Sequence, residues 1–374
     1  MTRQDLELPN EIEDEEHVLD VNPEEEVIQT SYDITAYGAD YPVDGLVKRM
    51  DQGDIVVPSF DPAYPGEGEV RGFQRRFVWS RPQMDKFIES LLLGLPVPGI
   101  FLVREKSNVL IVLDGQQRLR TLQAFYSGVH EGREYRLKHA QIPFTGLTYR
   151  ELDDEDRRRL NDSVIHATVL RQEHPVGSQD AVYSIFERLN TGGSPLQPQE
   201  IRVALYAGPF LRLISELNSN RDWRALYGRK SDRFKDQELI LRVLALYETS
   251  DTYERPVKGF LNHYLAANRN REDDGTRAMA ERFSEASRLI RQNIGSKAFR
   301  PVRALNAAVL DALMVGVMRR LDRGPMTNNK GMRPAYERLI KQERFSLATT
   351  SSTAAEDSVS DRLKAATAAF ARLR

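Results

Sequence analysis

A short polar segment, Asp114-Gly115-Gln116-Gln117-Arg118, has the residue types and the spacing to bind a phosphate. It follows an apolar run and precedes a helical pattern, which predicts a strand, a turn and a helix start. Glycine at the turn permits positive φ and a close approach of ligand to backbone. The first amides of that helix, over 116–119, would point outward with the positive end of the helix dipole and suit a phosphate. Arg118 adds a cationic fork, and Asp114 suits a Mg²⁺ ion or an attacking water.

A simpler interpretation of the same residues is purely structural. Asp114 would cap the helix, Gly115 would make the turn, and Arg118 would lie in solvent. The two consecutive glutamines favour phosphate binding, because glutamine gains little at a capping position. Spacing alone leaves both interpretations open.

The run 73–79, Phe-Gln-Arg-Arg-Phe-Val-Trp, has residue types that suit the same ligand. It places Gln74 and Arg75 between aromatic residues, directly before a helix that Ser80 can cap. These side chains could hold a phosphate or stack on a base. The alternative is that the aromatic residues are core and the arginines are surface.

The run 186–193 ends a predicted helix in Asn190-Thr191-Gly192-Gly193. Two glycines after a helix are typical of a C-cap, and the alternative is a loop that lines a nucleotide. A third polar run, 232–238, is expected to be the solvated start of another helix.

Regular elements must position these segments, and apolar periodicity predicts where they lie. A helix beginning at Arg81-Pro82 carries one apolar stripe as far as Leu92, and two β-rich runs over 100–103 and 109–113 form a hairpin that leads into Asp114. Further helices are predicted over 42–53, 148–160 with a Thr148/Glu151 capping box, 180–189, 199–206, 236–247, 257–267, 278–293, 302–321, 335–343 and 357–373, and further strands over 55–58 and 164–170.

This order of elements predicts an α+β fold class with three parts. Residues 1–30 are expected to be an acidic, disordered tail, residues 31–195 an α+β domain, and residues 196–374 an all-helical domain. The tail holds eleven acidic residues against one arginine, a net charge of −10, which leaves +8 on the rest of a chain whose total is −2. Such a tail either only solubilises or shields a basic nucleic-acid surface until another polyanion displaces it.

Composition removes several other kinds of chemistry. The chain has no cysteine, so disulfides and thiolate metal sites are excluded. Its six histidines form no metalloprotease or HNH-like cluster, and neither a P-loop motif nor a hydrolase nucleophile elbow occurs. No apolar run has the length of a membrane span and no secretory signal is present, so we expect no membrane partner and a cytoplasmic location.

Four blocks in order resemble the N-terminal domain family of GmrSD-type restriction endonucleases. They are FQRRFVW at 73–79, LLLGLPVP at 91–98, LDGQQRL at 113–119 and FERLNTGG at 186–193. The likeness continues through PLQPQEIR at 195–202 and DQELILR at 236–242, and beyond about 270 it thins to a general helical pattern.

The resemblance implies a ParB/sulfiredoxin-like fold for the N-terminal domain and a nucleotide site within it. It makes Asp114, Gln116, Gln117 and Arg118 the centre of hydrolysis, with Asp114 as a possible Mg²⁺ ligand. The residues expected to bind nucleotide beside that centre are Gln74, Arg75, Gly115, Asn190, Thr191, Gly192 and Gly193. The implied ligand is a nucleoside triphosphate (NTP) with Mg²⁺.

In complete members of that family, NTP hydrolysis is coupled to restriction of modified phage DNA and an HNH domain cuts. This sequence departs from the pattern because no histidine follows His263. We therefore expect an NTP-hydrolysing sensor or regulatory subunit of a DNA-restriction or phage-defence system, not itself a nuclease, with DNA and a separate HNH subunit as partners. The alternative is a non-catalytic DNA-binding module, or a scaffold for a partner nuclease.

Overall fold

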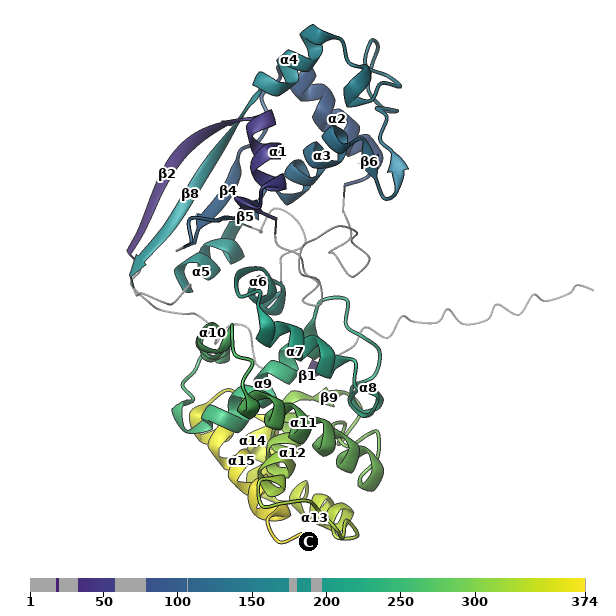
Figure 1. The fold of residues 1–374 in the computed structure, drawn as a ribbon. Coiled ribbons are helices and arrows are strands. Elements are labelled where there is room, and N and C mark those ends of the chain that lie inside the picture. The colour runs from purple at the N-terminus through teal and green to yellow at the C-terminus, as the bar shows by residue number, and fades with distance from the viewer. Residues whose placement is uncertain are drawn as a thin grey trace, which may run out of the picture.

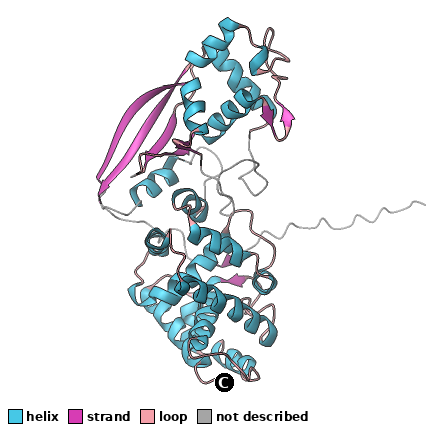
Figure 2. Ribbon diagram, in the orientation of Figure 1, coloured by secondary structure: helices cyan, strands magenta, loops and turns pink. Residues whose placement is uncertain are grey.

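The computed structural model of the 374-residue chain describes residues 18–19, 33–57, 79–105, 107–174, 180–189 and 197–373. The described chain has a mixed α/β part followed by a helical part, which lie at opposite ends of the molecule in Figure 1. Figure 2 shows the long strands gathered at one side of the first part, while helices dominate the second.

The elements of the α/β part run from the second strand to the fifth helix. They are β2 (Asp33–Pro42), α1 (Val43–Asp51), β3 (Ile55–Val56), α2 (Arg81–Leu92), β4 (Ile100–Arg104), β5 (Leu110–Asp114), α3 (Gln116–Ser127), β6 (Val129–His130), β7 (Arg133–Glu134), a 3₁₀ turn (Tyr149–Glu151), α4 (Asp154–Asp162), β8 (Val164–His174) and α5 (Asp180–Leu189).

The main sheet of the described ranges has five strands in the order β2-β8-β4-β5-β3. Pairing is antiparallel between β2 and β8 and between β4 and β5, and parallel between β4 and β8 and between β3 and β5. The 100–113 hairpin therefore forms as predicted and lies in the centre of the sheet. The sequence predicted an α+β fold class, and the structure shows a mixed α/β protein with a small mixed sheet and a helical C-terminal region.

Both faces of the central strands are covered, which explains why β5 is a continuous apolar run. Leu110 and Val112 pack on one face with α1, α2 and α3, whereas Ile111 and Leu113 pack on the other face with α5. All four side chains are buried. The residue that ends this strand, Asp114, is thus held at a rigid sheet edge.

Strand β2 was not expected from the sequence. It pairs with β8 over its whole length, from Asp33 opposite His174 to Pro42 opposite Val164. Most β2 side chains are exposed, so the strand lacks the apolar alternation that would mark it. Its partner β8 is correspondingly longer than the predicted 164–170 strand.

Capping motifs in this part predicted one helix start correctly and one helix wrongly. The Ser80 amide donates to Gln83 Oε1 at 2.8 Å, and α2 begins as predicted. The Thr148/Glu151 box also forms, at 2.9 Å, but it caps only the 3₁₀ turn. Leu152 is extended, and α4 restarts at Asp154 under an Asp153 cap, so the single 148–160 helix was a wrong expectation.

The helical part follows from the sixth helix onward. Its elements are α6 (Pro198–Leu205), α7 (Pro209–Asn218), α8 (Arg221–Tyr227), α9 (Lys235–Thr249), a 3₁₀ turn (Ser250–Thr252), α10 (Val257–Asn268), α11 (Asp274–Asn293), β9 (Leu305–Asn306), α12 (Ala307–Leu321), α13 (Met332–Leu339), α14 (Glu343–Thr350) and α15 (Glu356–Phe370). Helices α7, α8 and α14 were not expected, and the 302–321 helix begins later, at Ala307, under an Asn306 cap.

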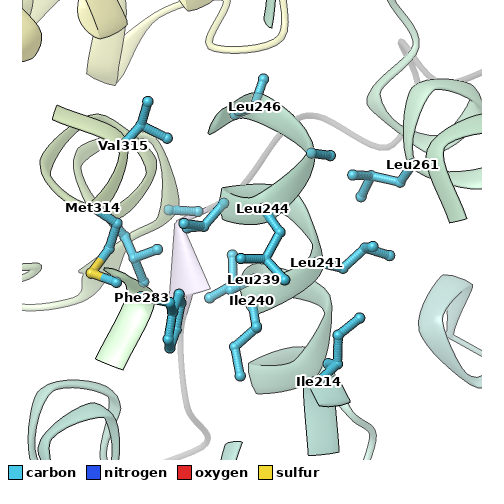
Figure 3. Packing of buried hydrophobic residues seen from close by; sticks show 14 of the residues in the cluster. Ile214, Leu239, Ile240, Leu241, Leu244, Leu246, Leu261, Phe283, Met314 and Val315 are labelled. Atoms are coloured by element: carbon cyan, nitrogen blue, oxygen red, sulfur yellow. The ribbon is translucent and has the colours of Figure 1, made fainter. Parts of the chain in front are cut away.

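Helix α9 is the centre of this part. Figure 3 shows its buried residues, among them Leu239, Ile240 and Leu244, facing side chains of α11 and α12 such as Phe283 and Met314. The same helix also packs against α7 and α10. The hydrophobic core that contains it continues through α6 and α5 to the sheet face, so one core spans the predicted boundary at 195.

Buried charges add specific links between these helices. Asp236 is fully buried and accepts hydrogen bonds from Asn218 at 2.9 Å and from Arg224 at 2.8 Å. The start of α9 is therefore not solvated, which corrects the expectation for 232–238. Deeper in the core, Asp311 accepts from Arg242 at 2.8 Å and from Arg362 at 3.1 Å, joining α9, α12 and α15.

A polar link also ties the hairpin to the helical part. Arg269, at the end of α10, donates to Glu105 Oε1 at 3.0 Å and to the Ala207 carbonyl at 2.8 Å. Of the acidic tail, the structure describes Val18–Leu19, which form β1 and pair with β9 in parallel. Among the described helices, none combines the length and the apolar character that a bilayer span requires.

Candidate functional site

The site begins where β5 ends at Asp114 and the chain turns into α3. Gly115 makes this turn in the left-handed region, with φ 98°. A Cβ at this position would overlap the side chain of Ile100, the first residue of the neighbouring strand. Only glycine satisfies both the positive φ and the close contact. The turn predicted from Asp-Gly is therefore present, and it is packed against the sheet.

Arg118 folds back over this turn and does not lie in solvent. Its Nη2 donates to Asp114 Oδ2 at 2.6 Å and to the Gly99 carbonyl at 2.9 Å. The Arg118 side chain is 13% exposed, and its buried Nε has no hydrogen-bond partner among the described residues. Arg118 thus fixes the Asp114 carboxylate to the start of β4.

Two details of the purely structural interpretation, for Asp114 and for Arg118, differ from the structure. Asp114 does not cap α3: among the described residues, no side chain caps that helix, whose N-cap is Gly115. Arg118 is largely buried instead of solvated. Only the expectation that Gly115 makes the turn is common to both interpretations.

The first turn of α3 is oriented as the sequence predicted, with one correction. Leu119 donates its amide to the Gly115 carbonyl at 3.0 Å, so this residue already belongs to the helix ladder. The outward amides of the first turn are those over 116–118 and not 116–119. Gln116 and Gln117 are both half-buried at this end of the helix.

Asp114 keeps part of its carboxylate available. Its side chain is 43% exposed, and within the described part of the chain only Oδ2 accepts a hydrogen bond. No group of three or more His, Asp or Glu side chains that could hold a metal occurs in the described ranges. A metal ion here would have Asp114 as its protein ligand and would need oxygens from a bound phosphate, a pattern that Mg²⁺ commonly adopts.

The run 73–79 reaches the same turn at its last residue. The Trp79 amide donates to Gln117 Oε1 at 3.4 Å, across 38 residues of sequence. Trp79 also packs edge-on against Phe87 of α2, with ring centroids 5.5 Å apart. Gln74 and Arg75, which were expected to bind nucleotide, lie outside the described residues.

The second predicted partner segment is described only at its borders. Asn190, Thr191, Gly192 and Gly193 lie outside the described residues. Before them, Glu187 of α5 pairs with Lys258 of α10 at 2.9 Å. After them, Glu200 of α6 accepts from the Gln197 amide at 2.6 Å and pairs with Arg233 at 2.7 Å.

A buried polar network lies beside those borders, beneath α6. Arg202 is 1% exposed and bonds to Asn262 at 2.8 Å, to Glu238 at 2.6 Å and to Gln199 at 3.2 Å. This network could not be predicted from the sequence, because Arg202 and Asn262 are 60 residues apart. It fixes α6 against α9 and α10.

Gly99 was missed by the sequence analysis, although it helps to shape the site. Its carbonyl accepts from Arg118, and a Cβ on Gly99 would come within 2.8 Å of the His166 carbonyl. The signal available in the sequence was Pro98-Gly99 directly before a strand, which marks a close backbone approach. Further along α3, burial lowers the pKa of the Arg120 guanidinium.

Comparison with known proteins assigns the region around this turn. Residues 46–207 match the family model described as GmrSD restriction endonuclease, N-terminal domain. Searches of the curated proteins and of the solved structures each found no match. The matched range contains the sheet strands β3, β4, β5 and β8 and the whole Asp114–Arg118 turn. This part of the chain therefore belongs to the family of GmrSD restriction endonuclease N-terminal domains.

Proposed function

We propose that this protein binds and hydrolyses a nucleoside triphosphate at the Asp114–Arg118 turn, as a sensor or regulatory component of a DNA-restriction or phage-defence system. The observation that carries the proposal is a helix start that no side chain of the described residues caps, next to a partly exposed carboxylate at one sheet edge. The family match supports the biological setting.

In the proposed mechanism the amides over 116–118 receive phosphate oxygens. Backbone N–H groups at a helix N-terminus bind anions without rearrangement, and they stabilise charge that develops as a phosphate bond breaks. Gln116 and Gln117 would add neutral donors at the rim of the same turn. Most of the rate enhancement would come from this fixed electrostatic environment.

Asp114 has a different role, which is to hold water or metal against the phosphates. A Mg²⁺ ion bound with the triphosphate would be held by Asp114 and would neutralise phosphate charge. Arg118 acts mainly as a positioning residue, because its Nη2 is already engaged by Asp114 and by the Gly99 carbonyl. Gln74, Arg75 and the residues over 190–193 would complete the pocket, as the resemblance implies.

The proposal includes several properties of the whole protein. The sheet and its α1–α4 layer would be a ParB/sulfiredoxin-like nucleotide fold working in the cytoplasm. Cutting of DNA is assigned to an HNH nuclease outside these 374 residues, since none of the residues after His263 is a histidine.

Substituting Gln116→Glu tests phosphate binding separately from folding. A carboxylate in the first turn of α3 stabilises the helix through its dipole by about 0.3–1 kcal/mol, yet it repels a triphosphate. We expect equal or higher resistance to urea together with at least about tenfold weaker binding of NTP·Mg²⁺, measured by titration calorimetry; tenfold corresponds to about 1.4 kcal/mol.

The matched control is Ser127→Glu, which adds the same charge to an exposed position at the other end of α3. It should leave nucleotide affinity unchanged. Equal affinity in Gln116→Glu and wild type would contradict phosphate binding at this helix start.

A non-catalytic DNA-binding module is the second candidate function. The observation in its favour is the charge of +8 on residues 31–374. In addition, Asp114 already neutralises Arg118, so this arginine offers less positive charge to a triphosphate. Contacts to DNA phosphates would give a steep fall of log K with log salt concentration. DNA binding that is salt-dependent but indifferent to NTP would favour this second function over the first.

A further inference from the structure

Two segments of the helical part bring their basic residues to one surface. The runs 223–231 and 294–306 hold six Lys or Arg residues and no Asp or Glu. Arg300 joins them by donating to the Leu226 carbonyl at 2.6 Å and also to the Tyr227 carbonyl. We call the exposed members, Arg229, Lys230, Lys297 and Arg303, the α8–β9 basic surface.

Two carboxylates near this surface are paired with arginines outside its four exposed members. Asp222 pairs with Arg291, and Asp236 pairs with Arg224. The first exposed acidic residue beyond it is Asp232. The surface therefore presents an excess of positive charge to any neighbouring polyanion.

The strand pair β1–β9 brings the acidic leader to this surface. The pairing is parallel, with Val18 opposite Leu305 and Leu19 opposite Asn306. In parallel strands the chains approach the pair from the same side, so the residues before Val18 and those before Leu305 enter together. Figure 1 shows β1 and β9 in the helical part, and Arg300, which precedes β9, bonds to the Leu226 carbonyl of α8.

The sequences that precede β1 and β9 carry opposite charges. Residues 1–17 contain seven acidic residues and one arginine, and five of the acids fall within 11–16, directly before β1. On the other side, Arg303, Arg300 and Lys297 precede β9.

We propose that residues 1–17 are a tethered polyanionic ligand of the α8–β9 basic surface, and that the β1–β9 pair is the tether. Tethering makes the encounter intramolecular and raises the effective concentration of the leader to the millimolar range for a short linker. The occupant is a peptide of this chain, and a nucleic-acid backbone is the competitor. The inference is independent of nucleotide hydrolysis at Asp114.

The absence of cysteine from the chain allows a clean distance measurement. Substituting Ile12→Cys and Val302→Cys in the full chain gives two sites for nitroxide labels; Val302 is 91% exposed, so its label disturbs no packing, and no acidic residue is lost. Pulsed dipolar spectroscopy at low salt should show a short distance population. Raising the salt to about 1 M, where the Debye length falls to about 3 Å, should convert it to a broad, longer one.

Charge reversal gives the decisive comparison. The double variant Lys297→Glu/Arg303→Glu should lose the short population at low salt. The control Lys86→Glu/Arg158→Glu, with the same charge change on exposed residues of α2 and α4, should keep it. A distribution unaffected by salt and by Lys297→Glu/Arg303→Glu would overturn the proposal. A second result would also overturn it: no short population at low salt, together with binding of duplex DNA that Lys297→Glu/Arg303→Glu abolishes. The surface would then bind nucleic acid and not the leader.

Discussion

At the scale of single residues, the site depends on a three-way contact at one sheet edge. Arg118 bonds to Asp114 from the same turn and to Gly99 from the neighbouring strand, while Gly115 packs against Ile100. The sequence predicted the turn and the orientation of the first α3 amides. It did not predict that Arg118 points inward, because the contact with Gly99 depends on which strand lies beside β5.

The two glycines that flank α3 offer a matched test of this packing. Gly115 and Gly128 both have positive φ, but a Cβ on Gly128 would meet nothing within 4 Å. Gly128→Ala should therefore cost only the backbone strain, about 1 kcal/mol. Gly115→Ala adds the overlap with Ile100 and should lower the free energy of unfolding by about 2–4 kcal/mol. Urea unfolding of both variants measures the difference; equal losses would show that the turn is not tightly packed.

At the scale of elements, local signals predicted those helices and strands that carry their own pattern. The α2 helix and the β4–β5 hairpin follow directly from capping, apolar spacing and the alternation of turns and strands. Strand β2 and the small β1–β9 pair carry no such pattern. They form because a distant partner, β8 or residues 305–306, supplies the hydrogen bonds.

The buried Asp311 is another feature that distance in sequence concealed. It contacts Arg242, 69 residues away, and Arg362, 51 residues away, and all three side chains are at most 4% exposed. An Asp311→Asn substitution would remove the carboxylate that two buried guanidinium groups share. Removing one partner of a buried ion pair typically costs about 3–5 kcal/mol, and we expect a loss of that size in urea unfolding.

The control for this prediction is Asp361→Asn on α15. Asp361 pairs with Arg344, whose side chain is 80% exposed, and this exposed pair should contribute at most about 1 kcal/mol. Similar losses in the two variants would mean that the Asp311 cluster does not hold α9, α12 and α15 together.

At the scale of the whole molecule, apolar and polar contacts both join the sheet to the helical part. The hydrophobic core runs from one sheet face through α5 and α6 into α9. Polar links are the bond from Arg269 to Glu105 on the hairpin and the pair of Lys258 with Glu187 of α5. The hairpin strand that starts near Glu105 ends at Asp114. A change at the candidate site thus has a direct structural connection to the helices that carry the α8–β9 basic surface.

This arrangement makes a prediction about DNA. If the leader occupies the α8–β9 basic surface, neutralising its acids with Glu13→Gln/Asp14→Asn/Glu15→Gln/Glu16→Gln should release the surface. We expect affinity for a duplex oligonucleotide to rise by at least about tenfold, with a steeper dependence on salt. Fluorescence anisotropy over a salt series measures both, and an unchanged affinity would show that the leader and DNA do not compete.

The most direct test of the central claim is phosphate release from a nucleoside triphosphate by the full chain. Wild-type protein with Mg²⁺ should release phosphate from at least one of the four common triphosphates. Asp114→Asn keeps an acceptor for Arg118, so it should stay folded by circular dichroism yet lose about 10²-fold or more of that rate. No release from any of the four with Mg²⁺ or Mn²⁺, or an equal rate in Asp114→Asn, would contradict hydrolysis at this turn.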